Sequence, residues 1–212
     1  DHALEFGMVL ALPAAVGLSV LSQPIISVLF ERGAFSPTAV DATAQTLFCY
    51  ALGLPAFIII KVLQPSFFAR YDTLTPVKVA SFMVLTNLVL NIILMQFLAH
   101  AGLALATSIT AWLNAAILAF ILKQKGLHQH SKKTHIKLAR IFMASAVMGM
   151  GLLGLREFVG DSIFASKSWD ILSLTTLIVF GLFLYVIPVF LFRVVRLSEV
   201  RQEIKSWVKN NQ

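Results

Sequence analysis

The chain has 212 residues, of which 58% are hydrophobic and only 13% are charged, and its mean hydropathy is +0.84. A soluble domain carries about 25% charged residues, so a water-soluble fold of this length is excluded, because it could not hide so much apolar surface. The net charge of +7 does not indicate a nucleic-acid-binding protein, since the basic residues lie between long apolar runs. These numbers predict an integral membrane protein.

Six apolar segments are each long enough to cross a bilayer core of about 30 Å, which takes roughly 20 helical residues. They cover residues 6–30, 42–69, 77–98, 103–122, 138–155 and 171–192. Each segment is continuously apolar rather than alternating, which favours helices over barrel strands. The predicted fold class is therefore an all-α integral membrane protein, with six transmembrane helices in residues 1–192.

Short polar stretches connect most of these segments. Residues 31–37 contain turn signals, and residues 70–76 end in Thr75-Pro76, which predicts that the third helix begins only after the proline. The connection at residues 100–102 is the shortest, so the third and fourth helices are expected to form an antiparallel hairpin.

A basic tail, residues 193–212, follows the last apolar segment. Its apolar residues recur at helical spacing among arginine, lysine and glutamate: Val194, Leu197, Val200, Ile204 and Val208. This pattern predicts an amphipathic helix on the cytoplasmic membrane surface, and a solvated tail helix is the alternative.

The distribution of basic residues predicts the orientation. Thirteen of the seventeen lysines and arginines fall on the side of the N-terminus, in residues 70–78, 123–140 and 193–212. Only Arg32, Arg156 and Lys167 fall on the other side. Because cytoplasmic loops carry the excess of basic residues, both ends of the chain are predicted to lie in the cytoplasm.

The seventeenth basic residue, Lys61, lies inside the second apolar segment, about 13 Å from Arg70 at the cytoplasmic end. A lysine at the bilayer centre costs about 2.5–3.5 kcal/mol, so such a residue usually faces a cavity or a partner. We predict that Lys61 binds a phosphate or another anion in a hydrated cavity. The alternative is a side chain that extends to the cytoplasmic headgroups.

Pro55 and Pro65 flank Lys61 in the same segment. Each proline removes one helical hydrogen bond and can kink the helix, so both are predicted to act as hinge residues. The alternative is that they have no special role, because prolines are frequent in membrane helices.

Polar residues face each other across the predicted hairpin. Asn87 and Asn91 share one helix face, and Thr107, Thr110 and Asn114 share a face of the next helix. We predict that Asn91 meets Thr110 and that Asn87 meets Asn114. Such a ladder would hold the two helices together, at about 0.6 kcal/mol per hydrogen bond. Alternatively, its oxygen atoms could coordinate a sodium ion, although neither helix contains a carboxylate.

Gly149, Gly151 and Gly154 predict close helix contact in the fifth segment, and a lipid-facing groove is the alternative. The sequence contains no phosphate-binding loop and no His-Glu-x-x-His motif, and Cys49 is its single cysteine. We therefore expect no enzymatic activity, no cofactor and no metal site.

The longest informative stretch is GLPAFIIIKVLQPSFFAR at residues 53–70, which is followed by Asp72 and by TPVK at residues 75–78. Shorter ones are LFERGAF at residues 29–35, AGLALATS at 101–108 and WLN at 112–114. Together these stretches resemble the MurJ/MviN lipid II flippases. The resemblance covers roughly residues 6–125, and beyond them it depends on hydropathy and charge.

The resemblance implies a fourteen-helix transporter of which this chain supplies the last six helices. Such proteins lie in the bacterial cytoplasmic (inner) membrane and move lipid II, the lipid-linked peptidoglycan precursor, to the outer leaflet by alternating access. The implied partners are lipid II, membrane lipids and the N-terminal half of the same protein, with a sodium or proton gradient as the candidate driving force. Lys61 would be the cationic cavity residue of this half. Asn87, Asn91 and Thr107 lie where a cation site would fall in sodium-coupled members.

Lipid II has an anionic diphosphate, a sugar-peptide head and a long polyprenyl tail. Lys61 would serve the head, and the glycine-rich fifth helix with the phenylalanine-rich sixth would form a groove for the tail. The alternatives are an exporter of another polyprenyl-linked saccharide or of a drug, and a non-transporting scaffold for cell-wall enzymes. A cationic Lys61 favours anionic cargo over a cationic drug.

Overall fold

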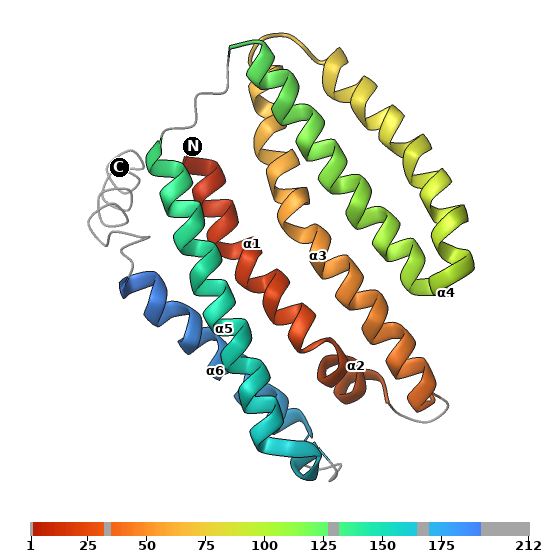
Figure 1. Cartoon of the computed structure of the whole chain (residues 1–212), viewed down its shortest axis with the longest axis vertical. Helices are drawn as coiled ribbons and strands as arrows, with labels where there is room; N and C mark the ends of the chain where they lie inside the picture. The colour runs from red at the N-terminus through yellow and green to blue at the C-terminus, as the bar shows by residue number, and fades with distance from the viewer. Residues whose placement is uncertain (1, 32–34, 127–131, 165–169, 192–212) are drawn as a thin grey trace, which may run out of the picture.

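The computed structural model describes residues 2–31, 35–126, 132–164 and 170–191. The described residues form six α-helices and no strand (Figure 1). The helices are α1 (His2–Val20), α2 (Ser22–Phe30), α3 (Pro37–Phe68), α4 (Leu74–Gln124), α5 (Lys132–Phe164) and α6 (Asp170–Leu191). The predicted amphipathic tail, residues 193–212, lies outside the described residues.

Helix α4 contains the third and fourth predicted segments. Its 51 residues would span about 76 Å if straight, far more than a bilayer core. The chain instead reverses at Ala99, whose φ of 47° and ψ of −123° are not helical, and two antiparallel arms result (Figure 1). Among the described residues, α1, α3, α4 and the apolar parts of α5 and α6 are long and apolar enough to cross a membrane. The predicted all-α membrane architecture is therefore confirmed.

Two predicted helix boundaries are wrong. The first predicted segment is divided at Leu21 into α1 and the short α2, so it is not one helix. Helix α4 begins at Leu74 rather than after Pro76, which lies in its first turn. A proline is tolerated there because the first N–H groups of a helix have no intrahelical acceptor.

The connection between α3 and α4 is held by Asp72. Its carboxylate accepts hydrogen bonds from the backbone N–H of Thr75 at 3.1 Å and from the Thr75 hydroxyl at 2.8 Å, and it pairs with Lys125 after the end of α4. The hydrogen bond from Lys125, followed by those from Thr75, lowers the pKa of Asp72 to about 2. Asp72 is therefore charged at neutral pH, and both arms of α4 are fixed at this end of the bundle.

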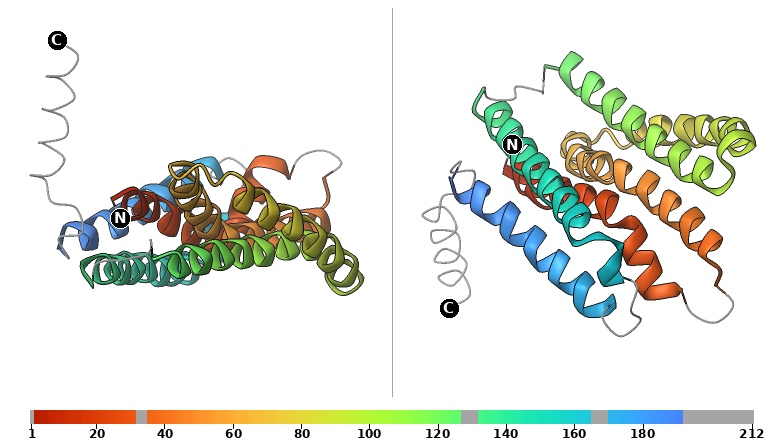
Figure 2. Two further views of the ribbon diagram at one scale, coloured as in Figure 1. Left: turned by 90° about the horizontal axis from the view of Figure 1, so that it is seen from above. Right: turned by 60° about the horizontal axis from the view of Figure 1, so that its bottom comes forward.

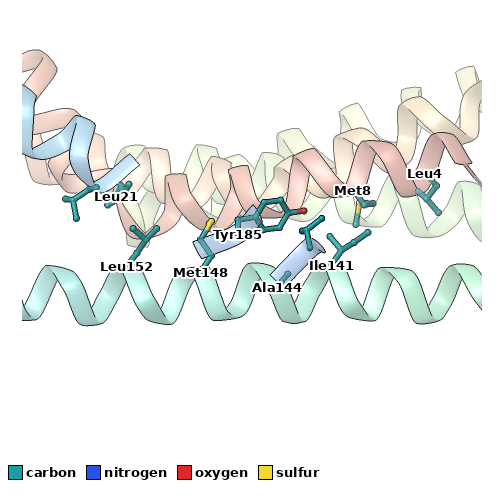
Figure 3. Packing of buried hydrophobic residues seen from close by; sticks show 10 residues of the cluster. Leu4, Met8, Leu21, Ile141, Ala144, Met148, Leu152 and Tyr185 are labelled. Atoms are coloured by element: carbon teal, nitrogen blue, oxygen red, sulfur yellow. The ribbon is translucent and has the colours of Figure 1, made fainter. Parts of the chain in front are cut away.

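Helix α1 lies between two groups of helices, with α3 and α4 on one side and α5 and α6 on the other (Figures 1 and 2). One hydrophobic core joins α3 to the arms of α4 and includes the almost fully buried Phe67 and Leu118. A second core joins α1 to α5 and α6 (Figure 3). The chain thus places α1 where it contacts both groups.

Candidate functional site

Lys61 lies on a face of α3 that the described helices leave open. Tyr50, Phe57 and Phe68 are exposed on the same face, at helical spacing from Lys61. Ile60 and Leu63 point to the other side of α3, into the core with α4. Within the described part of the chain, Lys61 makes no hydrogen bond or ion pair. Its ammonium group is therefore available to a partner outside these residues.

Pro55 and Pro65 both lie inside α3, which continues through them from Pro37 to Phe68. Pro55 is buried and Pro65 is exposed. Because proline has no N–H, the carbonyls of Ala51 and Lys61 each lose their usual helical donor. The structure shows one conformation of α3, so the hinge role remains a prediction.

Two side chains of the second arm of α4 donate to backbone carbonyls of α3 close to Pro55. The Ser108 hydroxyl donates to the Cys49 carbonyl at 2.6 Å, and the Trp112 indole N–H donates to the Leu52 carbonyl at 3.0 Å. No sequence pattern indicates this role, because the partners are 59 and 60 residues apart. These bonds fix α3 to α4 in the half of α3 that precedes Lys61.

The polar ladder is present between the arms of α4, but it is displaced by one helical turn from the prediction. The Asn87 side-chain amide donates to the Thr110 hydroxyl at 3.3 Å, and the Asn91 amide donates to the Asn87 oxygen at 2.9 Å. The predicted pair of Asn91 with Thr110 is not the one that forms. The reason is that the chain reverses at Ala99, two residues before the expected midpoint, which shifts the opposing positions by about four residues.

Thr107 is not part of this hydrogen-bonded ladder. Its hydroxyl donates to the Leu103 carbonyl of its own helix at 2.9 Å, and its oxygen keeps free lone pairs. The side-chain oxygens of Asn91 and Asn114 are shielded from solvent and have no hydrogen-bond donor among the described residues. Buried polar atoms normally have partners, so these two oxygens are candidate ligands for a cation or acceptors for a donor from another segment.

An apolar groove with a volume of about 470 Å³ lies between α1, α5 and α6. Its walls include Leu10 and Leu18 from α1, Met148 from α5, and Leu177 and Leu182 from α6. Such a groove offers dispersion and hydrophobic contacts to a hydrocarbon chain and few hydrogen bonds.

The three glycines of α5 that were predicted to allow close helix contact do not all do so. A Cβ atom on Gly149 would lie 2.7 Å from Val16 of α1, and one on Gly151 would lie 2.5 Å from Leu184 of α6. A Cβ atom on Gly154 would meet nothing within 4 Å. Gly149 and Gly151 therefore allow close approach of α1 and α6, whereas Gly154 does not take part.

Residues 1–193 match a protein family described as lipid II flippase MurJ. The chain belongs to this family. It is 38% identical over 204 residues to a probable lipid II flippase MurJ of Vibrio cholerae, an alignment that covers 94% of this chain and 39% of that protein. It is 43% identical over 129 residues to a probable lipid II flippase MurJ of Rickettsia prowazekii, covering 60% of this chain and 25% of that protein.

A solved structure has the same fold. It is described as lipid II flippase MurJ in an inward closed conformation, and it superimposes with a TM-score of 0.75 at 28% identity over 91% of this chain and 38% of the solved chain. The chain spans about two fifths of the length of the relatives that it matches most completely. The chain therefore belongs to a bacterial family of multi-pass membrane transporters rather than to an enzyme family. The resemblance found in its motifs is confirmed.

Proposed function

We propose that this chain is the C-terminal part of a flippase that moves lipid II across the bacterial cytoplasmic membrane by alternating access, for cell-wall synthesis. The observation that carries the proposal is the match of residues 1–193 to the lipid II flippase family. The chain covers only part of the relatives, so transport requires the preceding N-terminal helices as a partner.

In this proposal Lys61 binds the diphosphate of the substrate in a hydrated cavity between this chain and the missing helices. The exposed face that carries Lys61 and its lack of a partner among the described residues support this role. A lysine ammonium is a compact point charge with three donors, which suits a diphosphate whose position changes during transport. Pro55 and Pro65 would let α3 bend on either side of the site.

The apolar groove between α1, α5 and α6 would hold part of the polyprenyl tail while the head crosses. Its walls are almost wholly apolar and come from α1, α5 and α6. With the head at Lys61 and the tail in the groove, the anionic head stays in water and the tail stays in a hydrocarbon environment. This arrangement costs the least free energy.

The orientation with both ends of the chain in the cytoplasm belongs to the same proposal. The N-terminal end of α1, the α3–α4 connection and the end of α4 lie at one end of the bundle (Figure 1). That end carries Arg70, Lys78, Lys123 and Lys125, in agreement with the rule that cytoplasmic loops are basic.

Rescue of bacteria depleted of their own lipid II flippase tests the proposed function. A full-length protein that contains this chain is expected to restore growth and cell shape, and the chain alone is expected not to. Co-expression of the chain with the preceding helices as a separate polypeptide should restore rescue. If the full-length protein inserts into the membrane but does not rescue, lipid II is not the cargo. Export of another polyprenyl-linked saccharide or of a drug, or a scaffold for cell-wall enzymes, would then replace this function.

A cation site that couples transport to a sodium gradient is the second part of the proposal. The unpaired oxygen of Asn91 favours it, and Asn87 and Thr107 contribute further oxygens on the same helical arms. Amide and hydroxyl oxygens suit a hard cation, and the charge of a carboxylate would have to come from the helices that precede this chain.

Sodium is expected to raise the melting temperature of the purified full-length protein relative to choline at equal ionic strength, because a ligand that binds only the folded state stabilises it. Asn91→Leu should remove most of this increase. Thr86→Val is the matched control, since Thr86 lies on the same arm and its hydroxyl donates only to the Phe82 carbonyl. Equal melting temperatures in sodium and choline would show that the ladder only holds the arms together and that protons are the remaining candidate for coupling.

A further inference from the structure

Pro13 creates an unusual acceptor within α1. A proline has no N–H, so the carbonyl four residues earlier, that of Val9, loses its helical hydrogen bond. In a soluble helix water would satisfy such a carbonyl. In the hydrocarbon region of a membrane a partner must come from a neighbouring helix.

Tyr185 of α6 supplies this partner. Its hydroxyl donates to the Val9 carbonyl at 2.6 Å, and the residue is only 7% exposed. Figure 3 shows the ring lying in the layer between α1 and α5, beside Ile141, Ala144 and Met148. A buried tyrosine needs an acceptor for its O–H, and the proline-freed carbonyl meets this need. Each group therefore satisfies the other across 176 residues of sequence.

The same three residues form part of the wall of the apolar groove, since Val9, Pro13 and Tyr185 all line it. Without the tyrosine hydroxyl, the groove would expose an unpaired carbonyl to any hydrocarbon chain inside it. An unpaired polar atom in such a wall disfavours an apolar ligand.

We propose that Tyr185 is a positioning residue: its hydroxyl occupies the carbonyl that Pro13 frees on Val9, which fixes α6 on α1 and keeps the groove wall apolar. The groove thereby selects a purely hydrocarbon chain. The identity of that chain as a polyprenyl tail rests on the proposed function. The hydrogen-bonded link between α6 and α1 does not.

A double-mutant cycle on the full-length protein tests the link. Tyr185→Phe is expected to lower the melting temperature by about 2 °C, because one interhelical hydrogen bond is lost. In Pro13→Ala the new N–H of residue 13 can bond to the Val9 carbonyl, so the further loss caused by Tyr185→Phe should be less than half as large. Tyr71→Phe is the control, since the hydroxyl of this almost fully exposed tyrosine has no partner among the described residues. Equal losses in both backgrounds would overturn the proposal, because Tyr185 would then act independently of Pro13.

Photolabelling with a diazirine-bearing farnesyl phosphate tests the wall of the groove. Labelling of peptides from α1 and α6 is expected to fall about fivefold or more in Tyr185→Phe, and to recover in the double variant with Pro13→Ala, which leaves no free carbonyl. If labelling falls in Tyr185→Phe but does not recover in the double variant, the fall reflects lost packing. Tyr185 would then not act by keeping the groove wall apolar. Absence of labelling in the unmutated protein would overturn the proposal that the groove holds the tail, and with it the proposal that Tyr185 keeps the groove wall apolar. The double-mutant cycle of melting temperatures would still decide whether Tyr185 and Pro13 act as a pair.

Discussion

Under the proposed function, replacement of Lys61 by alanine in the full-length protein is expected to reduce transport about ten- to a hundredfold and to abolish rescue of flippase-depleted bacteria. The estimate follows from the loss of a charge-assisted hydrogen bond to phosphate, about 1.5–3 kcal/mol. Lys61→Arg should keep part of the activity, because it keeps the charge but changes the geometry of the donors. Rescue would be measured as growth on depletion, with membrane insertion checked by blotting.

Lys78→Ala is the matched control for this experiment. Lys78 is also an exposed lysine, but it lies in the first turns of α4 at the basic end of the bundle. Its removal should leave rescue intact. Normal rescue by the Lys61→Ala variant would show that the Lys61 side chain only extends to the cytoplasmic headgroups. The cationic cavity site would then have to be built by other residues.

The architecture of this chain can be predicted from its sequence because a membrane permits few secondary structures. Continuous apolar runs of about 20 residues can only be helices in lipid, so the segments at residues 42–69 and 171–192 predict α3 and α6 closely. The reversal inside α4 was expected from the short polar connection, but its position was not. An alanine at positive φ gives no sequence signal, and the two-residue difference moved the ladder by a helical turn.

The position of Lys61 inside a long apolar helix could also be predicted, whereas the face of α3 on which it lies could not. That face depends on which residues pack against α4, and α3 has apolar residues on every side. The Tyr185–Val9 bond illustrates a second limit. A proline inside a predicted membrane helix identifies a carbonyl in need of a donor, but the donor lies in another helix, 176 residues away, and only the three-dimensional arrangement identifies it.

Gly102→Ala is expected to destabilise the hairpin of α4 by about 3 kcal/mol or more, and to reduce the amount of protein in the membrane. A Cβ atom at position 102 would lie 2.4 Å from the Leu94 carbonyl oxygen and 2.9 Å from the Met95 nitrogen. These are backbone atoms, so no side-chain rotation can relieve the overlap, and the arms of α4 would have to separate. Separation would also break the bond between Asn87 and Thr110. Melting of the purified full-length protein and its level in membranes would be measured together.

Gly154→Ala is the control that separates this local effect from a general intolerance of larger residues. Position 154 is exposed on α5 and has open space around it, so an alanine there should be neutral or stabilising by up to about 1 kcal/mol through helix propensity. If Gly102→Ala melts like the unmutated protein while Gly154→Ala behaves as expected, the close approach of the two arms at Gly102 is not required. The reversal at Ala99 would then be set by the polar ladder and by the contacts of Ser108 and Trp112 with α3, rather than by the absence of a side chain at residue 102.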